Sequence, residues 1–321
     1  MICLGIEATA HTFGAAVVTG KKEVLSDVRD LYVTEKGGMI PSEVARHHES
    51  VKDRVVREAI EKAGVNKIDL VSYSRGPGLG GGILKIGLEK AKEIAKDLNI
   101  PIIGVNHCIA HLTSGGLFTD VKDPVYVYVS GANTQIIALE GGKFRIFGET
   151  LDIGMGNALD KFGRDIGLGF PSGPIIEKLA LDGNYVDLSY SVKGMDLSFS
   201  GIITQAINLS KKGIKKEDLC YSLQENIFAM LTEVSERAMA HCGKKEVLLI
   251  GGVGANKRLV TMLDVMCSER DGKSFVVPLK YAGDQAVMIA WQGILEWNAG
   301  RRKDNLEVKP YERTDGVDVF W

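Results

Sequence analysis

The chain has 321 residues, of which 45% are hydrophobic and 25% charged, and its net charge is −2. This composition is typical of a globular protein with roughly two domains, and the charge excludes a uniformly basic surface for nucleic acid. The five cysteines are scattered without a Cys-x-x-Cys pair, no apolar run is long enough to span a membrane, and the N-terminus lacks the basic segment of a signal peptide. We therefore expect a cytoplasmic protein with reduced thiols and no membrane association.

Residues 2–18 and residues 124–142 share one plan: an apolar strand, a turn of small residues and a second apolar strand. Each segment predicts a β-hairpin, and the backbone amides of such turns can face a phosphate. Residues 246–266 provide a third turn of small residues that could face a phosphate. Here a buried strand continues through a Gly-rich turn into a helix. The repetition predicts an α/β protein with a duplicated fold around a nucleotide cleft.

Amphipathic periodicity predicts helices over residues 50–64, 83–98 and 224–241. No low-complexity linker separates the two halves, and we place the domain boundary near residues 120–124. The predicted domains are an N-terminal lobe of residues 1–123 and a C-terminal lobe of residues 124–321. The last residues, which end in three large apolar side chains, predict a tail that packs back on the N-terminal lobe.

Two histidines, His107 and His111, are four residues apart in the segment NHCIAHL. On a helix this spacing brings both side chains to one face, where two imidazoles can reach one metal ion. Two unrelated histidines would show the same spacing, so the spacing alone does not decide. A metalloprotease of the H-E-x-x-H type is excluded because Cys108 stands where the catalytic glutamate would be.

A metal site needs a third ligand. Asp284 comes just before a predicted helix, where an aspartate is also the expected N-cap. Glu7 lies within an apolar strand and turn, and burying a carboxylate there is costly unless it has a partner. It is a candidate acid, base or orienting group. His47 and His48 are expected on the surface of a helix.

Residues 156–180 predict two helices joined by the loop GLGFPSGP. Pro174 suits the first position of the second helix and Gly173 its cap, so the amides of that helix start could face a ligand. Asp160 and Glu177 flank the loop as candidate acceptors for ribose hydroxyls. Each carboxylate could equally be a solvated charge on its helix.

Nine segments resemble, in order, the family of the tRNA threonylcarbamoyladenosine synthase catalytic subunit, the catalytic member of the KEOPS complex, formerly called an O-sialoglycoprotein endopeptidase. The segments are GIEATAHTFG, RGPGLG, NHCIAHL, YVSGANTQ, GETLDIGMGNALDKFGRDIGLGFPSGP, KGMDLSFSG, LLIGGVGANKRL, AGDQAVMIA and RTDGVDVFW. The resemblance covers nearly the whole chain and is to the archaeal and eukaryotic branch. It implies a duplicated α/β fold of the actin, sugar-kinase and Hsp70 type, with two lobes around a nucleotide cleft.

The resemblance also implies site residues. One divalent iron or zinc ion per subunit would be held by His107, His111 and Asp284, with Tyr128 close by as an additional candidate ligand. ATP or threonylcarbamoyl-adenylate would be bound by Tyr128, Val129, Ser130, Gly131, Ala132, Asp160, Gly173, Glu177 and Asn256. The sequence departs from the family pattern at Gln285 and Ala286, where an Asn-Gly pair is usual.

The implied activity is transfer of a threonylcarbamoyl group to N6 of the adenosine 3′ of the anticodon, in tRNAs that read codons beginning with A. The implied partners are tRNA, a small atypical protein kinase and small accessory subunits. Two alternatives stay open. A small-molecule kinase of the same fold would usually carry aspartate where this chain has Glu7, and a nucleotide-dependent scaffold protein would bind nucleotide without group transfer.

Overall fold

The computed structural model describes residues 1–33 and 39–321, which form two compact units. Unit 1 consists of Met1–Phe118, Gly142–Phe144 and Gly283–Trp321, and unit 2 of Thr119–Gly141 and Arg145–Ala282. This division differs from contiguous lobes of 1–123 and 124–321. The chain from Gly283 onward belongs to unit 1, since the helix that follows Gly283 packs on the first sheet.

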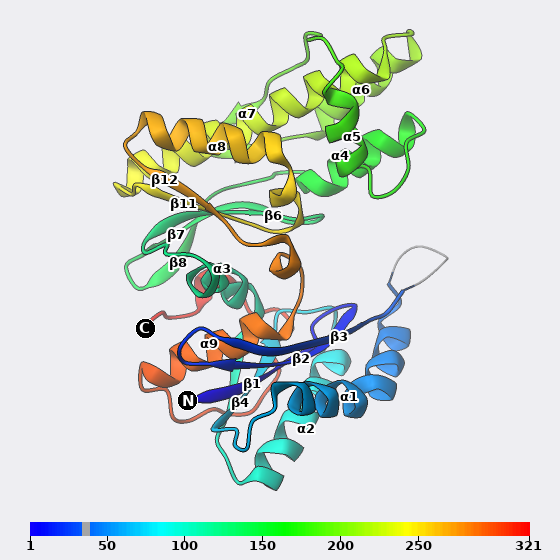
Figure 1. The fold of residues 1–321 in the computed structure, drawn as a ribbon. Coiled ribbons are helices and arrows are strands. Elements are labelled where there is room, and N and C mark those ends of the chain that lie inside the picture. The colour runs from blue at the N-terminus through cyan, green and yellow to red at the C-terminus, as the bar shows by residue number, and fades with distance from the viewer. Residues whose placement is uncertain (34–38) are drawn as a thin grey trace. The chain divides into compact units, whose positions relative to one another are not determined.

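Unit 1 contains a five-stranded sheet in the order β3-β2-β1-β4-β5 (Figure 1). Its elements are β1 (Ile2–Glu7), β2 (Thr12–Thr19), β3 (Val24–Leu31), α1 (Pro41–Ala63), β4 (Leu70–Gly76), α2 (Gly81–Leu98), β5 (Ile102–Asn106), α3 (His107–Phe118), α9 (Ala286–Asn298) and η3 (Thr314–Gly316). The first three strands are antiparallel, whereas β4 and β5 run parallel to β1.

Side chains alternate across β1 because successive residues of a strand point to opposite faces. Leu4 and Ile6 join the core that α1 and α2 cover, while Gly5 faces α9. A Cβ atom at Gly5 would lie 2.3 Å from the carbonyl oxygen of Ala286. The absence of a side chain at Gly5 therefore lets α9 lie directly on the sheet, and this sets the position of the loop that precedes α9.

Unit 2 also contains a five-stranded sheet, in the order β12-β11-β6-β7-β8. Its elements are β6 (Pro124–Val129), β7 (Thr134–Glu140), β8 (Lys143–Glu149), α4 (Met155–Asp165), α5 (Gly173–Ala180), β9 (Val192–Lys193), β10 (Asp196–Leu197), α6 (Ser200–Lys211), α7 (Lys216–Cys242), β11 (Glu246–Ile250), η1 (Gly252–Ala255), α8 (Lys257–Glu269), β12 (Lys273–Val276) and η2 (Leu279–Tyr281). Strands β11 and β12 are parallel to β6, and β7 is antiparallel to it.

The two sheets have the same internal topology. A hairpin, β1–β2 or β6–β7, is extended by a third strand on one side and by two parallel strands on the other. The hairpins predicted at residues 2–18 and 124–142 are confirmed, as is the strand, turn and helix of residues 246–266. The duplicated α/β architecture is thus present within the described residues.

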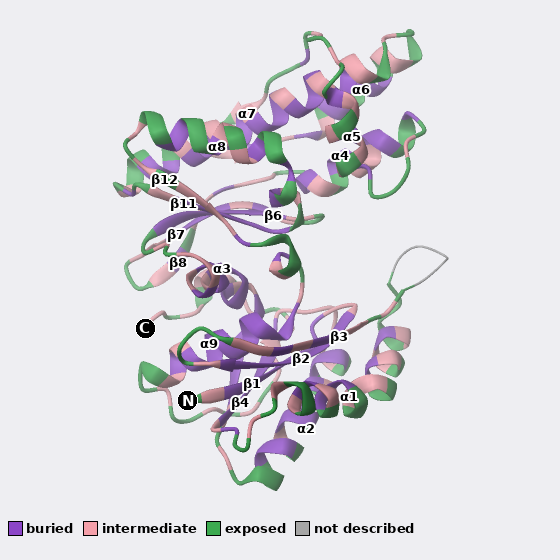
Figure 2. Cartoon of the chain, viewed as in Figure 1, coloured by how far each residue is buried: buried purple, intermediate pink, exposed green. Residues whose placement is uncertain are grey.

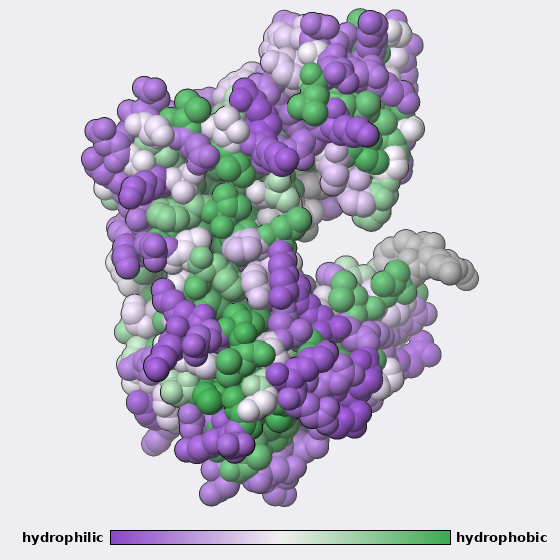
Figure 3. All heavy atoms as spheres, viewed as in Figure 1, coloured by the Kyte–Doolittle hydropathy of each residue, from purple (hydrophilic) through white to green (hydrophobic). Residues whose placement is uncertain are grey.

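Both cores are built from the sheets and the helices that cover them, and Figure 2 shows the central strands buried and the outer helix faces exposed. On the face shown in Figure 3, hydrophilic residues gather over α1. That helix begins nine residues before the predicted range, at Pro41, and ends before Gly64 as predicted. His48 is fully buried on α1, so the expected surface position is wrong for this residue.

In the described ranges, no helix combines the length and the apolar character needed to cross a membrane. The five cysteines are all free thiols.

Candidate functional site

Helix α3 carries both histidines and follows β5 without a linker, so its first residue, His107, lies at the carboxyl end of the sheet strand. His111 is one turn later. The two rings approach edge to face with centroids 4.7 Å apart, and both side chains are buried. The pairing predicted from the four-residue spacing is therefore present.

Asp284 brings a carboxylate to the same place. Its Oδ1 atom lies 3.4 Å from Nε2 of His107 and 3.2 Å from Nε2 of His111. One ligand atom from each of the three residues lies within 4.8 Å of the others. All three residues belong to unit 1.

The predicted N-cap role of Asp284 is wrong, because Gln285 caps α9. The side-chain oxygen of Gln285 accepts a hydrogen bond of 2.8 Å from the amide of Met288. Asp284 lies one residue outside the cap and is directed at the histidines instead. Gln285 departs from the family pattern, but its side chain can still cap the start of α9.

Glu7 forms a second layer behind His107. Its Oε2 atom lies 3.0 Å from Nδ1 of His107, and its Oε1 atom accepts hydrogen bonds from the amide of Thr9 at 2.7 Å and from the Thr9 hydroxyl. Glu7 is fully buried. A carboxylate that accepts from one ring nitrogen of a histidine fixes the ring and leaves the other nitrogen for a metal.

Burial and these carboxylates together shift the pKa values of the cluster. Burial opposes protonation of His107, but the neighbouring Glu7 and Asp284 outweigh it and hold the pKa of His107 well above its usual range. Burial lowers the pKa of His111. Burial disfavours the charged form of Asp284, yet the two histidines hold its pKa well below the usual range. Within the cluster, the two carboxylates therefore favour the protonated form of His107, whereas burial favours the neutral form of His111.

The donor set fits a divalent transition metal. Two imidazoles and one carboxylate are ligands that both zinc and non-heme Fe(II) accept, and three protein ligands leave coordination positions open for substrate. The second-layer carboxylate of Glu7 completes the arrangement that metal-binding histidines usually have. The residues present thus fit the divalent iron or zinc ion that the family resemblance implies.

Unit 2 contains a separate pocket of about 290 Å³. Five residues of the predicted nucleotide site line it, namely Gly131, Asp160, Gly173, Glu177 and Asn256. The remaining wall includes Gly252, Val253 and Ala255 of η1. Its volume is near the lower end of the range of roughly 300–1,000 Å³ for small-molecule sites.

The polar side chains in this pocket are held by the loops around them. Asp160 accepts a hydrogen bond of 2.7 Å from the amide of Ser172, and Glu177 accepts one of 2.7 Å from the amide of Lys257. Each bond uses one carboxylate oxygen. The geometry leaves the second oxygen of each carboxylate able to accept a hydroxyl, as binding of a ribose requires.

Asn256 has a different part. It caps α8, accepting from the amides of Arg258 and Leu259 at 2.9 and 3.3 Å, and it donates to Gln224 at 3.0 Å. Both ends of its amide are therefore engaged with the protein. Its contribution to the pocket is to hold the turn before α8, where Gly251 has a φ of +97° and a Cβ atom would lie 2.2 Å from the carbonyl oxygen of Val129.

The turn at residues 130–133 also differs in detail from the prediction. The amide of Ser130 donates to the carbonyl of Asn133 at 2.8 Å, so it is engaged within the turn. The carbonyls of Ser130 and Gly131 accept from the first amides of α4. Among the described residues, the amides of Gly131 and Ala132 have no acceptor, and these two remain as donors for an anion.

Two further predicted residues lie on β6. The side chain of Val129 is wholly within the core of unit 2, and its part in nucleotide binding remains a prediction. Tyr128 is buried in unit 2, and its part as a metal ligand remains a prediction. At the start of α5, Ser172 occupies the cap position predicted for Gly173, and Gly173 is the first helical residue. Thr9, which donates two hydrogen bonds to Glu7, is a site residue that was not predicted; its position two residues after Glu7 was the available indication.

Comparisons with known proteins show the family of the chain. A family model described as tRNA N6-adenosine threonylcarbamoyltransferase matches residues 23–291. The chain is 52% identical to the tRNA N6-adenosine threonylcarbamoyltransferase of Thermococcus kodakarensis over 327 residues, which cover 100% of both chains. It is 50% identical to a probable bifunctional tRNA threonylcarbamoyladenosine biosynthesis protein of Methanocorpusculum labreanum, over 99% of this chain and 60% of that protein.

Solved structures show the fold. HypF of T. kodakarensis is 14% identical with a TM-score of 0.64, over 92% of this chain and 47% of that chain. A ROK family glucokinase of Streptomyces griseus is 12% identical with a TM-score of 0.51, over 91% of this chain and 99% of that chain. Both neighbours have the actin-like fold of sugar kinases and related ATPases, and this chain shares it. The chain belongs to the tRNA N6-adenosine threonylcarbamoyltransferase family and is a transferase that modifies tRNA.

Proposed function

We propose that the chain transfers the threonylcarbamoyl group from threonylcarbamoyl-adenylate to N6 of the adenosine 3′ of the anticodon, in tRNAs that read codons beginning with A. The observation that carries the proposal is the convergence of His107, His111 and Asp284 within 4.8 Å. Membership of the family supports the reaction class, and the pocket in unit 2 supports a nucleotide-linked donor.

The reaction is an acyl-type transfer. The N6 amine attacks the carbamoyl carbon, a C–N bond forms, and the bond from that carbon to the phosphate oxygen breaks. The electron pair of the broken bond leaves with AMP, and the proton lost by the amine passes to solvent or to the released phosphate. The amine is a weak nucleophile, so the site must stabilise negative charge on the carbamoyl and phosphate oxygens.

The residues of unit 1 would hold a divalent iron or zinc ion. When bound, such an ion supplies Lewis acidity toward substrate oxygens. His107, His111 and Asp284 are its proposed ligands. Glu7 orients His107 and keeps its Nδ1 proton in place, so its proposed role is positioning rather than proton transfer to substrate.

The residues of unit 2 would bind ATP or the adenylate. The second oxygens of Asp160 and Glu177 would accept the ribose hydroxyls, and the amides of Gly131 and Ala132 would donate to a phosphate. A well-aimed donor to developing charge contributes about 3 kcal/mol. Asn256 and Gly251 keep the turn beside the pocket in shape.

We further propose that the protein works in the cytoplasm with a small atypical protein kinase and small accessory subunits. The relative from M. labreanum supports a partner, since its name gives two functions to one polypeptide of which this chain matches 60%. With a net charge of −2, the chain would gain affinity for tRNA from such partners.

The test uses preformed threonylcarbamoyl-adenylate, tRNA and the purified protein with Fe²⁺ or Zn²⁺, with and without the partner subunits, followed by mass analysis of digested tRNA. We expect the modified adenosine with the native chain. His111→Ala should reduce its formation by more than the roughly 10- to 100-fold typical of outer-layer changes. The exposed His241 gives the matched control, His241→Ala, which should act like the native chain.

Retained transfer by His111→Ala in chelator-treated buffer would overturn the metal role. Phosphorylation of a small hydroxylated compound by ATP, without modified tRNA, would support the kinase alternative. Nucleotide binding without any transfer, even with the partner subunits present, would support a scaffold.

A further inference from the structure

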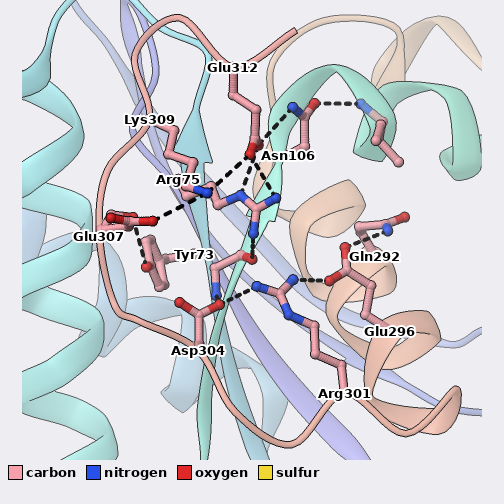
Figure 4. Close-up of polar contacts among 12 residues, drawn as sticks. Tyr73, Arg75, Asn106, Gln292, Glu296, Arg301, Asp304, Glu307, Lys309 and Glu312 are labelled. Carbon is pink, nitrogen blue, oxygen red and sulfur yellow. Dashed lines mark hydrogen bonds and ion pairs between the residues drawn. The ribbon is translucent and has the colours of Figure 1, made fainter. Parts of the chain in front are cut away.

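The C-terminal tail after α9 lies against β4 and β5 and is tied to them by polar contacts (Figure 4). All of these residues belong to unit 1. The residues of this network that Figure 4 labels are Tyr73, Arg75, Asn106, Gln292, Glu296, Arg301, Asp304, Glu307, Lys309 and Glu312. None of these residues has a role in the proposed reaction.

Glu312 and Arg75 form the centre of the network. Nε and Nη2 of Arg75 donate to Oε2 and Oε1 of Glu312 at 2.8 and 2.9 Å. Their side chains are only 12% and 13% exposed. The amide of Lys309 donates to the carbonyl of Arg75 at 2.6 Å, so backbone and side chain hold the tail at the same residue. A bidentate pair of this kind fixes the direction of both carboxylate oxygens.

Glu312 in turn orients Asn106. The Nδ2 group of Asn106 donates to Oε2 of Glu312 at 3.0 Å, and its Oδ1 atom accepts from the amide of Ile109 at 3.1 Å. Asn106 is 1% exposed and is the last residue of β5. Its oxygen therefore caps α3, and the contact with Glu312 decides which end of the amide faces the helix. The next residue is the candidate metal ligand His107.

A second arm joins the tail to both α9 and α3. Arg301 pairs with Glu296 on α9 and with Asp304 on the tail, and Asp304 accepts from the amide of Gly104 at 2.9 Å. Glu296 also accepts from Gln292 at 2.8 Å.

Gln292 completes this arm, since it accepts from the Thr113 hydroxyl on α3 at 2.7 Å. The network thus contacts α3 at its start and again two turns later, and it includes α9, which Asp284 precedes. Of the three candidate ligands, His107 and His111 lie on α3, and Asp284 lies just before α9.

We propose that Glu312 is a positioning residue for the metal centre, acting through Asn106 on the start of α3. The inference rests on the proposed metal site. Functional constellations need their ligands held within about 0.5 Å, and residues behind the ligands provide this. A change at Glu312 leaves His107, His111 and Asp284 chemically intact but releases the cap that sets the direction of the first turn of α3.

A purely structural tail clamp is the competing explanation, and it predicts lower stability without a change at the metal. The test is therefore a titration of the full chain with Co²⁺, whose visible absorption reports ligand geometry, together with thermal unfolding. We expect Glu312→Gln to bind Co²⁺ about 10- to 100-fold more weakly than the native chain, with an altered absorption spectrum. Glu307→Gln is the matched control on the same tail, because its side chain is 50% exposed and, among the described residues, pairs with Lys309 and not with Asn106 or Arg75; it should bind normally.

An exchange of groups gives a stricter criterion. Asn106→Asp keeps the oxygen that caps α3 but replaces the donor to Glu312 with a second carboxylate, so it should weaken Co²⁺ binding by a similar factor. In the double variant N106D/E312Q, the amide of the introduced glutamine can donate to the introduced aspartate. Recovery of at least ten-fold in affinity over N106D alone is expected.

Native Co²⁺ affinity in a folded Glu312→Gln protein would overturn the inference, whatever its melting temperature. If that variant does not fold, Glu312→Asp replaces it with the same expected loss, and native affinity there would equally overturn it. A native chain that binds no Co²⁺ would instead overturn the proposed metal site, and this inference with it.

Discussion

The Glu7 carboxylate lies 3.0 Å from Nδ1 of His107, and it is buried completely. A carboxylate without solvent is costly, and here its charge is balanced by the imidazole and by two hydrogen bonds from Thr9. The relationship orients the first candidate ligand of the metal before any metal binds. It explains why a charged residue is found at the end of an otherwise apolar strand.

Substitution of Glu7 by Gln should lower metal affinity about 10- to 100-fold, the range found for residues behind a metal ligand. The amide retains the shape of the side chain but loses the charge that holds the Nδ1 proton of His107. Calorimetric titration with Zn²⁺ measures the effect. Glu23→Gln, an exposed change in the β2–β3 turn, serves as control, and equal affinities for the two variants would contradict the orienting role.

Substitution of Gly5 by Ala should destabilise the protein by about 1–3 kcal/mol, as overpacking in a core does. The new methyl group would meet the backbone of α9 at 2.3–2.5 Å, and the helix would have to move. Because Asp284 precedes α9, metal affinity should fall as well. Urea unfolding and Zn²⁺ titration test both effects. Gly116→Ala on α3 meets no atom within 4 Å and should leave both quantities unchanged or raise stability slightly.

His48 should make stability depend on pH. Burial, with a further contribution from His47, lowers the pKa of His48 from 6.5 to about 4. As the pH falls, His48 therefore becomes protonated below pH 6.5 in the unfolded chain, but only near pH 4 in the folded chain. The contribution to stability is complete above pH 6.5 and is lost as the pH falls from 6.5 to 4, by about 3 kcal/mol in total.

In His48→Leu the fall in unfolding free energy between pH 7 and pH 4.5 should be smaller than in the native chain by about 2 kcal/mol. Urea unfolding at the two pH values measures the difference. His241→Gln, at an exposed histidine, should keep the native pH dependence. Parallel curves for His48→Leu and the native chain would show that His48 is not the responsible group.

Asp160→Asn should weaken AMP binding about tenfold, since a hydrogen bond to a charged acceptor contributes about 1.5–3 kcal/mol. The asparagine oxygen can still accept from the amide of Ser172, so the loop should keep its structure. Calorimetry with AMP provides the affinity. Asp187→Asn, on an exposed loop of the same unit, should bind AMP normally, and equal binding by both variants would remove Asp160 from the site.

Local patterns in the sequence were sufficient to predict the duplicated architecture. In the segments 2–18 and 124–142, two apolar runs of strand length separated by a turn of small residues predict hairpins, because such turns join neighbouring strands. The spacing of His107 and His111 predicts their common face because a helix turns every 3.6 residues. Such rules depend only on neighbours along the chain, and the structure confirms them.

Contacts between residues that are far apart in the sequence cannot be predicted from such rules, and only the tertiary structure shows them. Asp284 lies more than 170 residues from the histidines, and its proximity depends on the packing of α9 against Gly5. The local sequence is equally compatible with Asp284 or Gln285 as the N-cap of α9. In the folded chain Asp284 faces the two histidines, and Gln285 takes the cap position. His48 is buried because α1 covers the sheet at that turn. The connection from Glu312 through Asn106 to α3 is of the same kind, because hydrogen bonds between distant segments exist only once the sheet has brought them together.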